Sequence, residues 1–319
     1  MSNGITVPPA TASPLDHADW IELSAICTGD QNCSINDLVR EIRRSGSTDA
    51  LGDLDEAEYC SDVGAEKSIR IAEDAFSEIE RRSNACGSMR AYPFLVEDGY
   101  IEVDKNWDSS VYTVLLLLSS FGHNAGPKEL KGAKLFEEIS AEAAKSYFGG
   151  PHTHIDALVF GWPRTKNLPR RFDEAVNHLC SKLGEGVRFR ANLTEEYSQK
   201  KDDGLDIIVW RDFEDRKQGK IIGFGQCATG KRRDKKTGEL DVDEFCSMWM
   251  SVQPVVKPRK MFFVANQVED NKWCEMCIRG GIIFDRCRIA SHANNIIEEE
   301  LKKDCNDWIE HVLKNKVVN

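Results

Sequence analysis

The chain has 319 residues, of which 41% are hydrophobic, and this length is enough to bury one large core or two ordinary ones. Its longest apolar run, residues 111–121, has about half of the roughly twenty residues that a membrane-spanning helix needs, so we expect a buried helix there and no membrane partner. The net charge of −11 argues at first against a nucleic-acid partner, because phosphate binding needs clustered Lys and Arg.

The N-terminus and the cysteines indicate a cytoplasmic protein. Residues 1–14, MSNGITVPPATASP, contain no apolar segment of the kind found in signal peptides, and we expect a flexible leader over residues 1–15. Eleven irregularly spaced cysteines without a secretory signal indicate reduced thiols. Cys274 and Cys277 form a C-x-x-C pair with Cys287 nearby, which leaves a structural zinc site open as an alternative.

The acidic charge is concentrated in the first part of the chain. Residues 1–130 carry 10 Lys and Arg against 23 Asp and Glu, a net charge of −13, whereas the remainder carries +2. Basic clusters occur in the remainder at residues 164–171, 231–236 and 257–260. We therefore expect a basic, DNA-facing surface in this part of the chain. Its candidate nucleic-acid-binding residues are Arg170, Arg171, Arg232, Arg233, Lys235 and Lys236.

The acidic region has a mostly helical pattern. Apolar residues recur at three- and four-residue spacing from residue 16 to about residue 84, and Ser34 followed by Asp37 is typical of a helix N-cap. Short extended segments follow around a turn at residues 98–99, before the apolar helix at residues 111–121. Because of its negative charge, we interpret residues 16–130 as a helical accessory domain that docks a partner protein, rather than as a DNA-reading module.

A glycine-rich stretch at residues 122–132 predicts a domain boundary, and residues 131–319 then form the second domain. Its pattern predicts a helix at 134–148, a loop at 149–163, a helix at 168–183 and a strand at 187–193. His152 and His154 in the loop leave a metal site open as a further alternative. Later segments predict a helix at 240–250, strands at 260–265 and 280–290, and a closing helix at 296–312.

Two apolar runs flank a charged turn at residues 212–219 and predict an antiparallel hairpin. The runs cover residues 205–210 and 220–224. If the turn centres near residue 216, residues whose numbers sum to about 432 face each other, and Asp206 then faces Gln226. A carboxylate and an amide would thus meet at the open end of the hairpin, where side chains leave the core.

These residues resemble the motif of the PD-(D/E)xK, or restriction-endonuclease-like, nucleases. Residues 204–206, GLD, are similar to the G-[ILV]-D of the Mrr-like branch, and residues 225–227, GQC, occupy the place of its Gln-x-Lys. The chain departs from the motif at Ala228, where the family has Lys, and we expect Lys231 to supply the ammonium group. The resemblance implies a mixed α/β fold with an αβββαβ core over residues 131–319, preceded by the helical domain.

The resemblance also implies a metal-dependent deoxyribonuclease that cleaves DNA as an endonuclease, in a restriction or antiviral defence setting. A bound Mg²⁺ or Mn²⁺ would be held by Asp206, Gln226, the Cys227 carbonyl and Glu137, which lies in a Phe-Glu-x-hydrophobic setting typical of the family's first helix. Lys231 would orient the attacking water. Cleavage of both strands needs two sites, so we expect a homo-oligomer or a partner protein.

Three alternatives remain from the sequence. Residues 225–231 satisfy the G-x-x-x-x-G-K of a P-loop nucleotide-binding protein, although Arg232 follows in place of Ser or Thr. Cys227 is a candidate nucleophile if His178 or His152 lies beside it. Finally, the absence of Lys at position 228 is compatible with a catalytically inactive module that only binds nucleic acid or protein.

Overall fold

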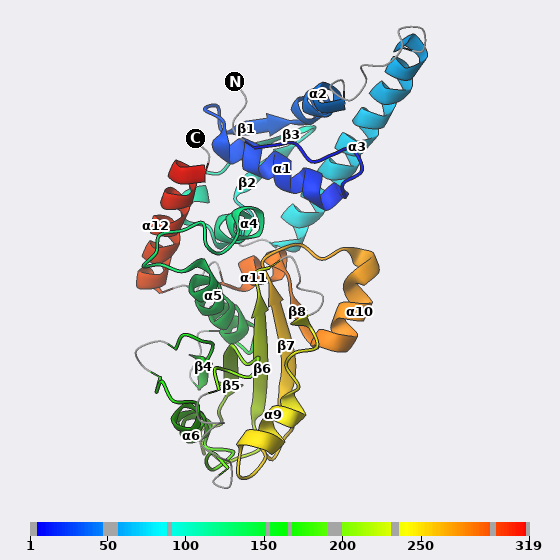
Figure 1. Cartoon of the computed structure of the whole chain (residues 1–319). Coiled ribbons are helices and arrows are strands. Elements are labelled where there is room, and N and C mark those ends of the chain that lie inside the picture. Colours follow the sequence, from blue (N-terminus) through cyan, green and yellow to red (C-terminus); the bar gives the residue numbers. More distant parts are fainter. Residues whose placement is uncertain are drawn as a thin grey trace.

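A computed structural model of the chain describes residues 5–46, 57–87, 91–150, 154–164, 168–190, 200–230, 236–293 and 298–316. The chain is a mixed α/β protein with a three-stranded sheet and a five-stranded sheet. Figure 1 shows the N-terminal elements at the top and the five-stranded sheet below them. In the described part of the chain, no helix combines the length and the apolar character needed to cross a bilayer.

The N-terminal elements are helical around a small sheet, as the sequence predicts. Strand β3 lies between β1 and β2 and pairs with both in antiparallel orientation. The predicted N-cap at Ser34 is confirmed, because its Oγ accepts a hydrogen bond from the Asp37 backbone N–H at 3.3 Å. The elements are α1 (Pro14–Cys27), β1 (Asn32–Ser34), α2 (Ile35–Gly46), α3 (Ala57–Ala85), β2 (Phe94–Glu97), β3 (Tyr100–Val103), a 3-10 turn (Trp107–Ser109) and α4 (Val111–Phe121).

The second part of the chain builds the five-stranded sheet, whose order is β4-β5-β6-β7-β8. The β4–β5 and β5–β6 pairs are antiparallel, whereas β6–β7 and β7–β8 are parallel. The elements are α5 (Gly132–Tyr147), β4 (Ile155–Val159), α6 (Phe172–Leu183), β5 (Ile207–Arg211), β6 (Ile221–Ala228), α9 (Val242–Trp249), β7 (Arg259–Val264), α10 (Asp270–Gly280), β8 (Ile282–Phe284), α11 (Arg286–Ala293) and α12 (Glu299–Lys316).

Successive side chains of β5 enter two different cores, as the two-residue period of a strand requires. Ile207 and Val209 belong to the larger core, together with apolar residues of α5. Ile208 and Trp210 belong to a second core, together with apolar residues of α6 and α9. Helix α5 therefore covers one face of the sheet, and α6 and α9 cover the other.

The predicted hairpin and its register are confirmed. Ile207 pairs with Gly225 in the β5–β6 ladder, so the numbers of facing residues sum to 432. Asp206 precedes the first strand residue, and its backbone N–H donates to the Gly225 carbonyl at 2.9 Å. The apolar helix predicted at residues 111–121 is also confirmed, with the same bounds as α4.

Two predictions beside the hairpin are wrong. Residues 149–163 were expected to form a loop, but β4 lies within them and pairs along its whole length with β5. The strand predicted at 187–193 does not form over 187–190, where only Phe189 makes a bridge, to Met250. Residues 191–193 lie outside the described residues. The first strand of the sheet therefore comes before α6, not after it.

The predicted strand at residues 280–290 is a short strand followed by a helix. Only β8 is extended, and α11 begins two residues after it ends, where Asp285 caps the helix by accepting a hydrogen bond from the Arg288 backbone N–H at 3.0 Å. Helix α10 was not predicted. It carries Cys274 and Cys277 on an exposed to half-buried surface.

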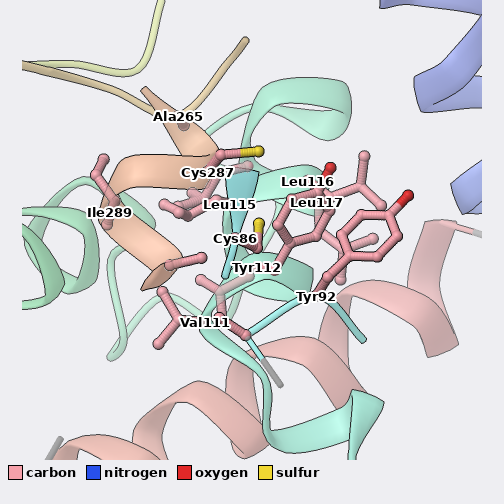
Figure 2. Close-up of a cluster of buried hydrophobic side chains, with 14 of the residues drawn as sticks. Cys86, Tyr92, Val111, Tyr112, Leu115, Leu116, Leu117, Ala265, Cys287 and Ile289 are labelled. Carbon is pink, nitrogen blue, oxygen red and sulfur yellow. The ribbon is translucent and has the colours of Figure 1, made fainter. Parts of the chain in front are cut away.

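One continuous core crosses the predicted domain boundary near residue 130. Figure 2 shows Tyr112 and Leu115 of α4 close to Cys287 and Ile289 of α11. At the edge of this core, the buried guanidinium of Arg286 donates to both carboxylate oxygens of Asp19 on α1, at 2.8 and 2.9 Å. The acidic N-terminal elements are therefore packed against the sheet domain through apolar contacts and through a buried ion pair.

Candidate active site

Two carboxylates predicted from the sequence meet beside Gly161, just after β4. A Cβ atom built on Gly161 would lie 2.7 and 2.8 Å from the two carboxylate oxygens of Glu137 and 2.9 Å from Oδ1 of Asp206. Glu137 comes from α5 and Asp206 from the start of β5. The two side chains thus converge on one point beside a glycine, which leaves room for both.

Backbone hydrogen bonds join three strands at this point. The N–H groups of Phe160 and Gly161 donate to the Asp206 carbonyl at 2.7 and 3.0 Å. The Cys227 N–H, near the end of β6, donates to Oδ2 of Asp206 at 2.7 Å. The position of the Asp206 carboxylate is therefore fixed by the ends of β4 and β6 as well as by its own strand.

Lys134 supplies an ammonium group that the sequence reasoning missed. Its Nζ lies 2.6 Å from Oε2 of Glu137 and 2.7 Å from the carbonyl oxygen of Gly161. Lys134 and Glu137 are three residues apart on α5, a spacing that places two side chains on the same helix face. The i,i+3 spacing was visible in the sequence, but the contact with Gly161 depends on the tertiary fold.

The electrostatic environment disfavours the charged forms of both carboxylates. Burial raises the pKa of Glu137 to about 8; the ion pair with Lys134 opposes this shift, and repulsion by Asp206 adds to it. Burial also raises the pKa of Asp206 to about 7. The hydrogen bond from the Cys227 N–H opposes this shift, and repulsion by the charge of Asp202 adds to it. A cation placed between the two carboxylates would stabilise their ionised forms.

Glu138, the carboxylate next to Glu137 in the chain, faces elsewhere. Burial raises its pKa, and the acidic side chains of Asp304 and Glu300 on α12 contribute to the shift. Asp203, three residues before Asp206, accepts a hydrogen bond from the indole N–H of Trp249 at 2.6 Å. These two residues therefore lie outside the carboxylate pair.

The side-chain contacts of Gln226 lie away from the carboxylate pair. Its Nε2 donates to Glu239 at 3.0 Å, while its Oε1 is buried and has no hydrogen-bond partner among the described residues. The negative charges of Asp206 and Glu137 raise the pKa of the adjacent Cys227 thiol, so this side chain lies on the side of the carboxylate pair. Because neighbouring strand residues point to opposite faces, Gln226 projects away from Glu137.

The environment of Cys227 is unfavourable for a nucleophile. Burial raises the pKa of its thiol well above the usual range, and the negative charges of Asp206 and Glu137 raise it further. His152, one of the two partners considered, lies outside the described residues. Residues 225–228 belong to β6, so this part of the P-loop-like pattern is extended strand and not a phosphate-binding loop.

The basic candidates are only partly described. Lys231, Arg232, Arg233 and Lys235 lie outside the described residues. The charge of Lys236 lowers the pKa of Asp206, so this lysine is within electrostatic reach of the site. On the other side, Arg171 pairs with Asp173 at 3.0 Å at the start of α6, and the Arg170 carbonyl accepts a hydrogen bond from Arg164 at 2.8 Å.

The carboxylates of the site offer few ligands for a metal ion. Within the described ranges, no group of three or more His, Cys, Asp and Glu side chains is arranged as a metal site. This includes Cys274, Cys277, Cys287 and His154. The pair of Glu137 and Asp206 remains compatible with Mg²⁺, which takes one or two protein carboxylates and keeps several waters.

Comparison with known proteins identifies no relative of this chain. No protein-family model matches the sequence, and no match was found among the curated proteins or the solved structures.

Proposed function

We propose that the chain is a metal-dependent nuclease whose active site is built on Glu137, Asp206 and Lys134. The observation that carries this proposal is the convergence of the buried Glu137 and the half-buried Asp206 on Gly161, with the Lys134 ammonium 2.6 Å from Glu137. Buried carboxylates with raised pKa values gather where a cation or a proton is handled. A nearby ammonium suits chemistry on an anionic substrate.

The order of the elements supports the proposal. Helix α5 is followed by the antiparallel strands β4, β5 and β6, then by α9 and the parallel strand β7. Apart from α6 between β4 and β5, this order is similar to the αβββαβ order that the sequence resemblance implies. Asp206 comes directly before β5, as that resemblance implies, whereas the Gln226 side chain is bonded to Glu239 and takes no part in the proposed site.

The residues fit a divalent cation held by Glu137 and Asp206. When bound, Mg²⁺ or Mn²⁺ would make a coordinated water nucleophilic at neutral pH and would stabilise the extra charge on the phosphate. Ionisation of both carboxylates would then be favoured, which offsets their burial. Lys134 would hold Glu137 in place and present an ammonium group to the phosphate, so we assign to Lys134 the role that we expected of Lys231.

We propose DNA as the substrate, because a basic residue near the site favours the binding of an anionic polymer. Lys236 lies on the segment that follows β6, and its charge lowers the pKa of Asp206. A strand of phosphates passing the carboxylates would meet this ammonium group.

A second candidate is a binding module without cleavage. Ala228 is fully buried where the motif has its lysine, and the Gln226 side chain is bonded to Glu239. Such a protein would bind nucleic acid through the same basic residues but would not need the carboxylate pair.

Incubation of supercoiled and linear DNA with Mg²⁺ or Mn²⁺ tests the two candidates. The nuclease predicts metal-dependent cleavage by the native chain and its loss in Asp206→Asn and in Glu137→Gln. Asp203→Asn is the matched control, since this neighbouring carboxylate is bonded to Trp249. Tight DNA binding without cleavage under all metal conditions would favour the binding module.

A further inference from the structure

An exposed indole belongs to the residue that follows Gly161 in the chain. Trp162 follows Gly161 in the chain and is 43% exposed. By contrast, Trp210, Trp249 and Trp308 are at most 2% exposed and belong to the cores. An exposed aromatic ring on the residue next to the site gains stabilisation when a flat ligand covers one of its faces.

The segment that carries Trp162 is fixed by hydrogen bonds. The Trp162 backbone N–H donates to Oδ2 of Asp202 at 3.1 Å. One residue earlier, the Gly161 carbonyl accepts from Lys134 at 2.7 Å and the Gly161 N–H donates to the Asp206 carbonyl at 3.0 Å. The backbone beneath the indole is thus held by groups of the candidate active site itself.

A positive charge lies against the ring. The guanidinium carbon of Arg164 is 5.4 Å from the centre of the Trp162 ring and 5.1 Å from that of Phe160. Arg164 is anchored by donating to the Arg170 carbonyl at 2.8 Å. An aromatic ring beside a guanidinium is the combination that binds successive bases of single-stranded nucleic acids, through stacking and through charge.

We propose that Trp162 stacks on an unpaired base of the substrate, so that the site takes single-stranded or locally unpaired nucleic acid. A base within a duplex is covered on both faces by its neighbours, and it offers a face to an indole only after it has unstacked. This inference rests on the proposed nuclease for the position of the scissile phosphate. The stacking contact itself is independent of cleavage.

Binding of a fluorescent oligothymidylate, measured by anisotropy in the Asp206→Asn background without metal, tests the contact. Trp162→Ala should raise Kd by about 5- to 150-fold, the equivalent of about 1–3 kcal/mol for one stacked base, while Trp162→Phe should retain most of the affinity. An abasic strand of equal length and charge should bind with the same Kd to the protein that keeps Trp162 and to the Trp162→Ala variant. Phe213→Ala removes another exposed aromatic, on the β5–β6 turn, and should leave Kd unchanged.

The outcomes separate stacking from catalysis. An equal effect of Trp162→Ala on the thymidylate and the abasic strand, or no effect on either, would overturn the stacking proposal, even if the native chain cleaves DNA. A base-dependent loss in a chain that never cleaves would support stacking and reject the nuclease. Absence of binding to both strands in every variant would overturn the stacking proposal, whereas the nuclease is decided separately by the cleavage assay.

Discussion

The Nζ atom of Lys134 lies 2.6 Å from Oε2 of Glu137, so an ammonium group reaches the carboxylate pair from α5 although the strand motif has Ala228 in place of Lys. We predict that Lys134→Met lowers the rate of DNA cleavage by about 10²–10³-fold, the range found when one donor to developing charge is removed. Lys134→Arg should retain part of the activity, because it keeps the charge but changes the geometry.

Lys145→Met is the matched control for this prediction. Lys145 forms the same i,i+3 pair, with Glu142, on the same helix, at 2.9 Å. Its removal should leave the cleavage rate within about twofold, as expected for a partly exposed pair away from the chemistry. An equal loss of rate in both variants would show that Lys134 acts only through the stability of α5.

Gly161 leaves the space in which the carboxylates converge. Gly161→Ala would place a methyl group less than 3 Å from oxygens of Glu137 and Asp206, so we expect it to displace both and to abolish metal binding and cleavage. Gly230→Ala is the control, since a Cβ there meets no atom within 4 Å. Circular dichroism should show both variants folded, and unchanged activity of Gly161→Ala would contradict the geometry of the site.

The raised pKa of Glu137 predicts a stability change with pH in the metal-free protein. Between its ordinary pKa of 4.5 and the folded value of about 8, the folded chain binds more protons on Glu137 than the unfolded chain does. The free energy of unfolding should therefore fall as pH rises through this window. Glu137→Gln removes this pH dependence. Its free energy of unfolding should exceed that of the native chain by about 1–3 kcal/mol near pH 8 and should differ little near pH 4.

Urea denaturation in the presence of a chelator measures this difference. Glu142→Gln, on the same helix, serves as the control for a general effect of removing a carboxylate. Saturating Mg²⁺ should raise the free energy of unfolding of the native chain at pH 8, because a ligand that binds only the folded state stabilises it. A gain from Glu137→Gln that does not vary with pH would contradict a buried, proton-binding carboxylate.

The ion pair between Asp19 and Arg286 predicts how strongly the N-terminal helices are attached to the sheet domain. Asp19 accepts hydrogen bonds from Arg286 and Arg82, and the buried Glu22 carboxylate remains close to both guanidiniums. We therefore expect Asp19→Asn to lower the free energy of unfolding by about 1.5–3 kcal/mol at neutral pH, the range for lost hydrogen bonds to charged groups. The exposed pair of Asp243 and Lys257 is the control, and Asp243→Asn should change stability by less than about 0.5 kcal/mol.

The same pair predicts an acid dependence of the opposite sign to that of Glu137. Arg286 and Arg82 hold the pKa of Asp19 at about 2 despite its burial, below the ordinary value of 3.8. The stabilisation by Asp19 is therefore present above about pH 4 and lost as pH falls towards 2. The difference between the native chain and Asp19→Asn should shrink over this range in urea denaturation, and a constant difference would argue against an ionised Asp19.

The hairpin could be predicted because its information is local. Two apolar runs and a charged turn determine which residues face each other, and the pairing of Ile207 with Gly225 agrees with the predicted register. The capped helix after Ser34 and the apolar helix α4 are predictable for the same reason. Asp206 and Glu137 could be proposed from the resemblance of their surrounding residues to a nuclease motif, and the structure brings them together at Gly161.

What the sequence did not reveal depends on contacts between distant segments. Strand β4 is short and lies at the edge of the sheet, where its residues are half-buried or exposed, so it has no strong two-residue apolar pattern. Val187 and Phe189 do alternate with basic residues, but Phe189 makes only an isolated bridge with Met250. Lys134 belongs to the site only because α5 packs against the end of β4.

The central claim, that Glu137 and Asp206 together hold a divalent cation, is tested most directly by calorimetric titration of the chain with Mn²⁺. We predict one site per chain and at least about tenfold weaker binding in Glu137→Gln and in Asp206→Asn, since each variant removes one of two charged ligands. Asp203→Asn should bind as the native chain does. Equal Mn²⁺ affinity in the native chain and in both carboxylate variants, or no binding by the native chain, would contradict the claim.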